Sequence, residues 1–342
     1  MTIIECDDSH AARWDAYVAT SPTSAFYHRW AWRTINRDEL GHRTFSLAAM
    51  EGDAIVGVFP VVQVKTRLFG NILCSMPFVN YGGPSADSPA IEQALLDAAS
   101  QLTEREQADY LEVRSRQPLA RPWPTSTHKV SLVIDLQRDP EVLFKAFTTK
   151  HRQEIRRAYK NGFTARFGGA ELLDDFFAVL SESWHAHGTP LYQKAYFTRI
   201  VETFGKDIRI GVVYAGDDPA AVAFDGLHNG TVEGMWLGSK AQYRNRLVGY
   251  VLYWELIKNA CENGFDRFHL GRSTVESSSE SFKKKWNADA LQLYWSYVLR
   301  TLPKLPELNV TSRKFQLAIM VWQEAPAWVV GRIGPRIARG IP

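Results

Sequence analysis

Apolar residues recur at three- and four-residue intervals in some stretches of the chain and alternate with polar residues in others. The first pattern is typical of a helix with one buried face, and the second of a half-buried strand. The clearest helical face consists of Val248, Val251, Leu252, Leu256 and Ala260. It predicts a helix over 252–263, ended by Gly264, because glycine readily adopts the left-handed conformation of a helix C-terminus. We expect a strand at 265–270, a break at Gly271, and then a polar segment suited to binding.

The same patterns give a repeated order of elements. The first half predicts a helix through Val18, helices at 25–37 and 90–102, and strands at 2–6, 43–50, 54–64, 71–79, 110–114 and 130–136. The second half predicts helices at 171–186, 195–204 and 252–263, and strands at 163–167, 208–215, 220–227, 232–237, 265–270 and 291–299. Each half is strand, two helices, three antiparallel strands, helix and two strands, with an offset of roughly 160 residues.

The predicted fold class is therefore α/β (α+β), with two tandem domains that each contain a mixed, mostly antiparallel sheet flanked by helices. A chain of 342 residues is also too long for one ordinary core. We expect a first domain at 1–138, a second domain with the active site at 139–301, and a tail at 302–342. Asp139 and Pro140 predict a helix start, in a segment that bridges the domains as far as Tyr159.

Composition favours a globular protein of the cytoplasm. The chain is 45% hydrophobic and 23% charged, and no apolar run reaches the ~18 residues that span a bilayer. We expect no signal peptide, because no basic segment followed by an apolar one begins the chain. Cys6, Cys74 and Cys261 lie too far apart for a disulfide framework. We predict no metal site, because His185 and His187 point to different faces of a helix.

The net charge of +3 is too small to indicate nucleic-acid binding, but its distribution is uneven. From residue 303 onward there are six Lys or Arg residues against Glu307 and Glu324. Apolar residues lie beside them, which suits peripheral contact with an anionic membrane surface. The alternative is a helix packed on the second domain. The apolar positions are Phe315, Leu317, Ile319, Met320, Val321, Trp322, Trp328, Val329, Val330 and Ile333.

A series of short motifs carries a family resemblance. They are Arg67-Leu-Phe-Gly-Asn71, Met76-Pro-Phe-Val-Asn-Tyr-Gly-Gly-Pro84, Gly188-Thr-Pro190, Tyr253-Trp-Glu255, Gly271-Arg-Ser273 and Phe282-Lys-Lys-Lys-Trp286. The element order resembles the Gcn5-related N-acetyltransferase fold in tandem, as in the FemAB aminoacyltransferases of peptidoglycan bridges. The motifs resemble most closely the FemAB-related proteins of PEP-CTERM/exosortase and exopolysaccharide gene clusters, over about residues 10–300.

This resemblance implies an enzyme that transfers an aminoacyl or acyl group to an amine of a cell-envelope or exopolysaccharide precursor. It implies aminoacyl-tRNA or acyl-CoA as the donor substrate, no permanently bound cofactor, and a cytoplasmic location that includes the inner face of the membrane. Two alternatives stay open. One is a non-catalytic scaffold of a polysaccharide-export or exosortase system. Two departures from the family pattern favour it: His269 stands where family members usually have Asp, and Asn287 stands where they often have Gly after the Trp. The other is an ordinary acetyl-CoA-dependent N-acetyltransferase.

The resemblance assigns the candidate catalytic residues. Phe282 and Lys283 match the pair whose lysine suits stabilisation of the negatively charged oxygen in acyl transfer; the alternative for Lys283 is a solvated run of lysines. Glu255 is a candidate base for the acceptor amine. Arg272 follows a glycine at a strand end and suits a phosphate or carboxylate. Its alternative is an ion pair with Glu255.

Further residues are candidates for substrate binding. Arg152, Arg156 and Lys160 fall on one helical face, which suits a phosphorylated substrate or a tRNA acceptor end; a plain solvated helix is the alternative. The paired glycines Gly82 and Gly83 would let a ligand approach the backbone closely; the alternative is that they form a tight turn before Pro84. The remaining candidates are Tyr81, Gly82, Gly83, Arg244, Trp236 and Trp286. The sequence leaves the oligomeric state open.

Overall fold

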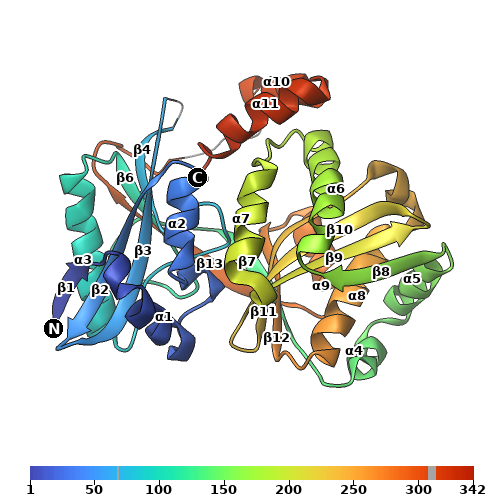
Figure 1. Ribbon diagram of the computed structural model, residues 1–342, viewed down its shortest axis with the longest axis horizontal. Helices are drawn as coiled ribbons and strands as arrows, with labels where there is room; N and C mark the ends of the chain where they lie inside the picture. Colours follow the sequence, from blue (N-terminus) through green and yellow to red (C-terminus); the bar gives the residue numbers. More distant parts are fainter. Residues whose placement is uncertain (68, 307–312) are drawn as a thin grey trace. The chain divides into compact units, whose positions relative to one another are not determined.

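The computed structural model describes residues 1–67, 69–306 and 313–342 (Figure 1). Packing divides the chain into two compact units. Unit 1 contains Met1–Val130 with the described residues of 291–308 and 339–342, and unit 2 contains Ser131–Ala290 with the described residues of 309–338. The domain boundaries expected after residues 138 and 301 stay a prediction. Leu68 of one motif, and 307–312 of the expected tail, lie outside the described residues.

Unit 1 is built on a mixed, mostly antiparallel sheet. The strand order is β1-β2-β3-β4-β6-β13, followed by the first part of β7. Within it β4 and β6 are parallel, and β13 pairs antiparallel with β6. The strands are β1 (Thr2–Glu5), β2 (Arg43–Glu51), β3 (Ala54–Thr66), β4 (Gly70–Cys74), β5 (Ser85–Ala86, paired with β3), β6 (Tyr110–Ser115), β7 (Thr125–Asp135) and β13 (Asp289–Leu299).

Alternation along β2 explains the two cores of unit 1, because successive side chains of a strand point to opposite faces. Phe45, Leu47 and Ala49 belong to a core with α3 (Pro89–Arg105). Ala48 and Met50 belong to a second core with α1 (Ala11–Thr20). The helix expected over 25–37 is wrong in part: it is a short turn, η2 (Phe26–His28), followed by α2 (Ala31–Asp38). The strand expected over 71–79 ends at Cys74.

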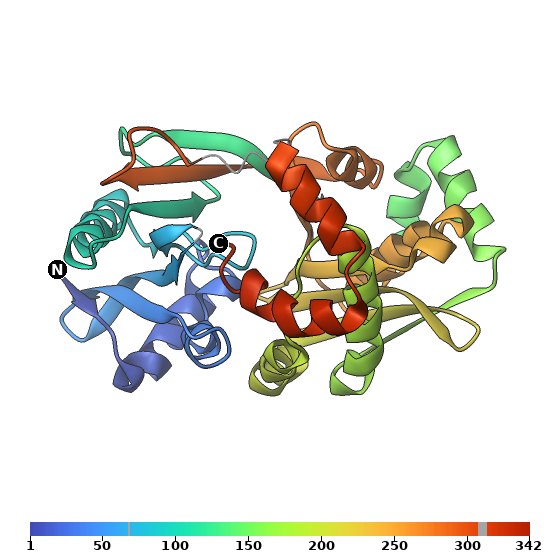
Figure 2. The ribbon, with the colours of Figure 1, turned by 90° about the horizontal axis from the view of Figure 1, so that it is seen from above.

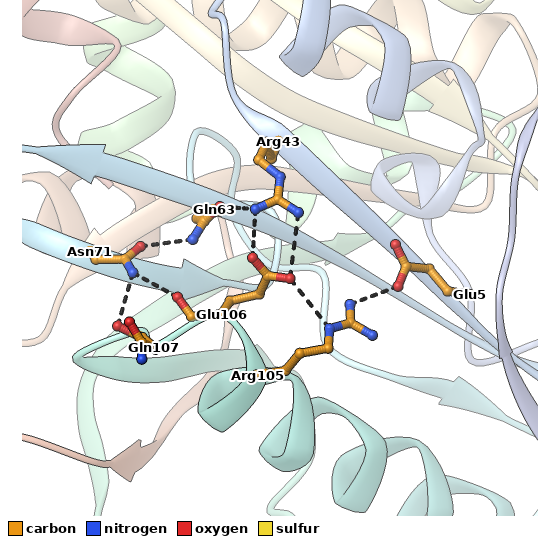
Figure 3. A network of polar contacts seen from close by, with 7 residues as sticks. All are labelled: Glu5, Arg43, Gln63, Asn71, Arg105, Glu106 and Gln107. Atoms are coloured by element: carbon orange, nitrogen blue, oxygen red, sulfur yellow. Dashed lines mark hydrogen bonds and ion pairs between the residues drawn. The ribbon is translucent and has the colours of Figure 1, made fainter.

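A polar network fastens the C-terminus of α3 to the sheet of unit 1 (Figure 3). Arg43 donates to Glu106 at 2.5 Å, and Arg105 donates to Glu5 at 2.8 Å. Asn71 donates at 3.0 Å to the backbone oxygens of Glu106 and Gln107. Exposed ion pairs each contribute only about 0–1 kcal/mol, so the network fixes the register of these elements more than it stabilises them.

Unit 2 is also built on a mixed, mostly antiparallel sheet, in the order β7-β12-β11-β10-β9-β8. Its strands are β8 (Phe163–Gly168), β9 (Ile208–Ala215), β10 (Asp218–His228), β11 (Thr231–Ser239) and β12 (Arg267–Thr274). Figure 2 shows α6 (Leu173–Ala186) and α7 (Lys194–Phe204) on one face of this sheet and α4, α5 and α8 on the other. The latter span Pro140–Ala146, Thr149–Tyr159 and Val248–Glu262. The predicted fold class is confirmed for both units.

Several local predictions in unit 2 need correction. The helix expected from residue 252 begins four residues earlier, at Val248. The strand expected to break at Gly271 continues to Thr274, with Gly271 inside it at a φ of +82°. The polar segment after it forms a helix, α9 (Ser278–Lys284). The helix start at Asp139 is confirmed: its side chain accepts a hydrogen bond from the Glu141 backbone at 2.9 Å.

The C-terminal segment forms two helices, α10 (Arg313–Gln323) and α11 (Ala327–Ala338). The end of α10 is held on α6, since His185 Nε2 lies 2.9 Å from the backbone oxygen of Trp322 and Gln323 donates to that of Ala186 at 2.8 Å. Throughout the described ranges, every helix is too short or too polar to cross a membrane.

Candidate active site

The strands β11 and β12 lie side by side over only a short length. Their parallel register joins three residue pairs, from Thr231 with Arg267 to Glu233 with His269. β11 then continues to Ser239 and β12 to Thr274. A pocket opens where the strands part, between β10, β11, β12 and α8. Its lining includes Asp225, Gly234, Trp236, Tyr253 and Leu270.

Two glycines make the point of divergence possible. A Cβ on Gly271 would lie 2.9 Å from the backbone oxygen of Gly234, and one on Gly234 would lie 2.9 Å from that of His269. Gly271 also has a left-handed φ of +82°, which side chains rarely tolerate. Both positions therefore require glycine for close backbone approach.

Lys283 lies at this point of divergence. Its Nζ donates hydrogen bonds of 2.9 Å to the backbone oxygen of Gly271 and 3.2 Å to that of Arg272. The side chain is 3% exposed, and it forms no ion pair with any described residue. Burial, with a contribution from the nearby Arg272 guanidinium, lowers its pKa to about 7. An ammonium has three donors; two of them hold the β12 backbone, and the third has no hydrogen-bond partner among the described residues.

Aromatic rings fix α9 against α8. Phe282 packs edge-on against Tyr250 and Tyr253, with centroids 5.3 and 5.2 Å away. Trp286 is fully buried and stacks on Tyr253 at 5.7 Å. It also meets the ring of His151 from α5 at 4.4 Å. These contacts position Lys283, which lies between Phe282 and Trp286 in the chain.

Polar groups around Trp286 have few partners. The Nε1 of Trp286 and both ring nitrogens of His151 are buried without a hydrogen-bond partner among the described residues. Burial, with a contribution from Lys285, lowers the pKa of His151 to about 4. His151 is therefore neutral near pH 7, and the sequence motifs did not point to it.

Glu255 on α8 accepts a short hydrogen bond from the hydroxyl of Tyr159 at the end of α5. Burial, and then the Glu255 carboxylate, raise the pKa of Tyr159. The tyrosine therefore keeps its proton, and its hydrogen bond to Glu255 joins α5 to α8. The role of Glu255 as a base stays a prediction.

A buried ion pair lies beside the pocket, and sequence reasoning missed it. Arg209 donates to Asp225 Oδ2 from Nε at 3.0 Å and from Nη2 at 2.7 Å, and to Asn259 from Nη1 at 2.9 Å. Burial raises the pKa of Asp225, while Arg209 opposes that rise. A signal was present: an aspartate inside the apolar run 220–227 of a strand is costly to bury unless it is paired.

The basic residues predicted to bind substrate differ in whether they are hydrogen-bonded within the protein or exposed to solvent. Arg152 donates to the backbone oxygens of Lys145 at 2.8 Å and Phe147 at 2.5 Å, so it ties α4 to α5. Arg156 is exposed on α5, and Lys160, the residue that caps the C-terminus of α5, is also exposed. Arg244 is also exposed, in the turn η5 (Ala241–Arg246) before α8.

The N-terminus of α8 follows η5 directly. Leu247 caps it in a left-handed conformation, with a φ of +62°, and no side chain there accepts a hydrogen bond from the first turn. The first N–H groups of a helix suit a phosphate or pyrophosphate.

The three candidates of unit 1 are buried. A Cβ on Gly82 would lie 2.5 Å from Met76, and one on Gly83 would lie 3.0 Å from Ser115. Tyr81 is 1% exposed and packs against Tyr27. Packing is sufficient to explain both glycines, and a role in binding stays a prediction. Across the described ranges, no three His, Cys, Asp or Glu residues are grouped as metal ligands.

Residues 147–284 match the family described as the acetyltransferase (GNAT) domain. This stretch lies within unit 2 and includes β11, α8, β12 and Lys283. No curated protein matches the chain.

Known structures share the fold over nearly the whole chain. FemX is 13% identical, with a TM-score of 0.67 over 89% of this chain and 98% of FemX. L-PGS from Bacillus licheniformis is 15% identical, with a TM-score of 0.56 over 94% and 98%. A tandem GNAT protein from the clavulanic acid biosynthesis pathway is 12% identical, with a TM-score of 0.53 over 89% and 99%. At these identities the likeness establishes the fold, which is of the tandem GNAT type.

Proposed function

We propose that the protein is an N-acyltransferase whose reaction takes place where β11 and β12 part. The observation that carries this proposal is the buried Lys283 ammonium at that point, bound to the backbone of Gly271 and Arg272. A positive charge held without a carboxylate partner can stabilise negative charge that develops on a reacting oxygen.

In the proposed reaction the acceptor amine attacks the activated carbonyl carbon. A C–N bond forms, and the C–O bond of an aminoacyl ester or the C–S bond of a thioester breaks. The amine proton passes to a base, for which Glu255 is our candidate, and a proton is returned to the departing oxygen or sulfur, which leaves as an alcohol or thiol. Lys283 donates its remaining N–H to the oxyanion. Phe282 and Trp286 hold Lys283 in place. Arg272, Arg244 and Trp236 contribute to substrate binding.

We propose aminoacyl-tRNA or acyl-CoA as the donor. The exposed Arg156 and Lys160 favour a polyanion such as a tRNA acceptor end, and the uncapped start of α8 suits a pyrophosphate. The donor is a substrate and not a resident cofactor. Similarity in fold to FemX and to L-PGS supports an aminoacyl group.

The proposed acceptor is an amine on a cell-envelope or exopolysaccharide precursor, in a PEP-CTERM/exosortase-associated protein of the FemAB-related type. Such precursors are assembled from cytoplasmic substrates, so we propose that the protein acts in the cytoplasm, peripheral to the inner face of the membrane. The support is the motif series that ends in Phe282-Lys-Lys-Lys-Trp286.

An ordinary acetyl-CoA-dependent acetyltransferase is a second candidate, which the match of residues 147–284 to the acetyltransferase (GNAT) domain favours. Native mass spectrometry of the protein from its own cells tests between donors, because the mass of a retained ligand identifies it. Turnover is then measured with that donor and an amine panel, with Lys283→Met beside Lys284→Met. Saturable ligand binding without turnover would favour a scaffold and refute the enzyme proposal.

A further inference from the structure

Exposed large apolar side chains are concentrated on the two C-terminal helices. Among the described residues nine are exposed, and five of them lie on α10 and α11. Their exposed fractions range from 42% for Ile333 to 73% for Trp328. Single exposed apolar residues are ordinary, but a dense cluster of them indicates a binding surface. We call the cluster the tail surface: Leu317, Met320, Val321, Trp328 and Ile333.

The helix α10 has an inner and an outer face. Leu317, Met320 and Val321 are spaced by three and four residues, so they share the outer face. The inner face packs on the C-terminal end of α6 and the residues after it: Ile319 lies against Gly188, and the backbone of Trp322 is bonded to His185. The outer residues therefore add nothing to the packing of α10 on α6, and their apolar area stays in water.

The helix α11 continues the same arrangement with charge. Trp328, Arg332 and Arg336 are spaced by four residues, and all three are exposed. Gly334, on another face, lies against the Trp322 ring. An exposed tryptophan beside arginines suits the headgroup layer of a bilayer, where an aromatic ring is partly buried and a guanidinium reaches phosphate.

We infer that the tail surface docks the protein on an anionic membrane surface, with both helices lying in the plane of the interface. Residues 313–342 contain five Lys or Arg residues and one acidic residue, Glu324, so their charge complements anionic lipid. Helices of 11 and 12 residues are roughly 17–18 Å long, short of the ~30 Å hydrocarbon core. They are therefore suited to lie on a membrane and not to cross it.

A second copy of the chain is a poorer occupant of this surface. A two-fold dimer places the same patch of both copies together. The interface would then contain Arg332 and Arg336 from both copies, and like charges in an interface disfavour association. Anionic lipid satisfies both the apolar and the basic residues. The inference is independent of acyl transfer, because membrane binding requires no turnover.

Vesicle flotation of the full-length protein tests the inference. Two vesicle types are compared: phosphatidylcholine alone, and phosphatidylcholine with roughly 30% phosphatidylglycerol. We expect at least about tenfold stronger partitioning into the anionic vesicles, and a marked loss in high salt. Two double variants should each weaken that partitioning by about tenfold: Leu317→Ser with Val321→Ser, and Arg332→Gln with Arg336→Gln.

Matched controls keep the number and type of changes constant. Val142→Ser with Val275→Ser removes two other exposed apolar residues, and Lys65→Gln with Lys206→Gln removes two other exposed charges. Thermal melts verify that all variants are folded. The inference would be overturned if the wild type bound both vesicle types equally. It would also be overturned if the tail variants bound the anionic vesicles as strongly as the control variants do. The same holds if the tail variants change only the mass in light scattering, since a second copy would then be the occupant.

Discussion

The Nζ of Lys283 lies 2.9 Å from the backbone oxygen of Gly271, twelve residues earlier in the chain. This bond joins α9 to β12 where the backbone of Gly271 also approaches that of Gly234. The Lys283 ammonium and the point where β11 and β12 separate are therefore parts of one local structure. A change at either residue should affect both the geometry and the chemistry that we propose there.

Replacing Lys283 should impair turnover far more than donor binding. If its ammonium stabilises a developing oxyanion, Lys283→Ala should lower kcat by ~100-fold or more, which corresponds to about 3 kcal/mol. Lys283→Met fills more of the buried space and should show a similar loss, which separates lost charge from a cavity. Steady-state kinetics and donor titrations measure the two effects.

The neighbouring lysines serve as controls. Lys284 is exposed and pairs with Glu280 at 2.7 Å, and Lys285 is exposed beside Phe282. Lys284→Ala and Lys285→Ala should therefore cost little. Equal, small and salt-dependent losses at all three positions would indicate a general basic patch and contradict the assignment to Lys283.

As pH rises, titration of Lys283 should lower kcat but raise the stability of the folded protein. Its pKa is lowered from 10.5 to about 7, so the ammonium is lost as pH rises through 7 and kcat should fall. Between pH 7 and 10.5 the unfolded chain binds a proton that the folded chain does not. The stability of the wild type relative to Lys283→Met should therefore rise over that window.

Lys283→Arg tests the same titration from the other direction. A guanidinium stays charged across this range, so the fall in kcat above pH 7 should be absent in the variant, even if its maximal rate is lower. Identical falling limbs in the wild type and Lys283→Arg would mean that another group titrates, and would contradict the role of the ammonium.

The sequence predicts the sheets well because their signals are local. Alternation in β2 separates Phe45 and Leu47 from Ala48, and these residues do enter different cores. The start of α4 follows from Asp139, whose side chain caps the helix within two residues. Each of these features depends on neighbours in the chain, and for that reason pattern reasoning finds them.

The site is harder to predict because its contacts are distant in the chain. β12 continues past Gly271 because Gly234, 37 positions earlier, leaves room for its backbone. α9 has few apolar residues and is stabilised by the packing of Phe282 and the bonds of Lys283. One local signal for α9 was present: Ser277 accepts from the backbone of Glu280 at 3.2 Å, as in a capping sequence.

Gly271 should not tolerate a side chain. Gly271→Ala would put a Cβ 2.9 Å from the oxygen of Gly234, at a positive φ. We expect a loss of about 1–3 kcal/mol in the free energy of unfolding, with reduced turnover, because Lys283 binds the same peptide. Gly249→Ala is the matched control, since its Cβ would have Phe282 at 3.9 Å as its nearest neighbour. Thermal melts that do not distinguish the two variants would contradict this account of the strand parting.

His151 should make the protein sensitive to mild acid. Its pKa is lowered from 6.5 to about 4, so the unfolded chain binds a proton between these values that the folded chain does not. The His151 contribution to stability is therefore complete above pH 6.5 and lost as pH falls toward 4, by at most about 3 kcal/mol. His151→Phe, which keeps the contact with Trp286, should flatten the stability curve over this window. Denaturant titrations at several pH values measure it, and parallel curves would contradict the prediction.

A cut between Arg138 and Asp139 should leave the first fragment incomplete. β13 comes from the far side of the cut, yet it pairs with β6 from Tyr294 with Ser115 to Leu299 with Tyr110. It also contributes Tyr297, 3% exposed, to a core with Tyr110. Residues 1–138 alone would therefore expose both a strand edge and an apolar surface.

We expect the 1–138 fragment to lack a cooperative thermal transition, and a fusion of 1–138 to 288–303 through a flexible linker to regain it. Circular dichroism melts measure both. A fusion to the same segment with Tyr297→Ser is the control, because it restores backbone pairing while removing the buried ring. If 1–138 alone melts cooperatively, β13 is dispensable and the first domain ends where the sequence pattern placed it. If only the fusion with Tyr297 melts cooperatively, the first domain includes β13, which follows the second domain in the sequence. A single cut in the chain then cannot separate the two domains.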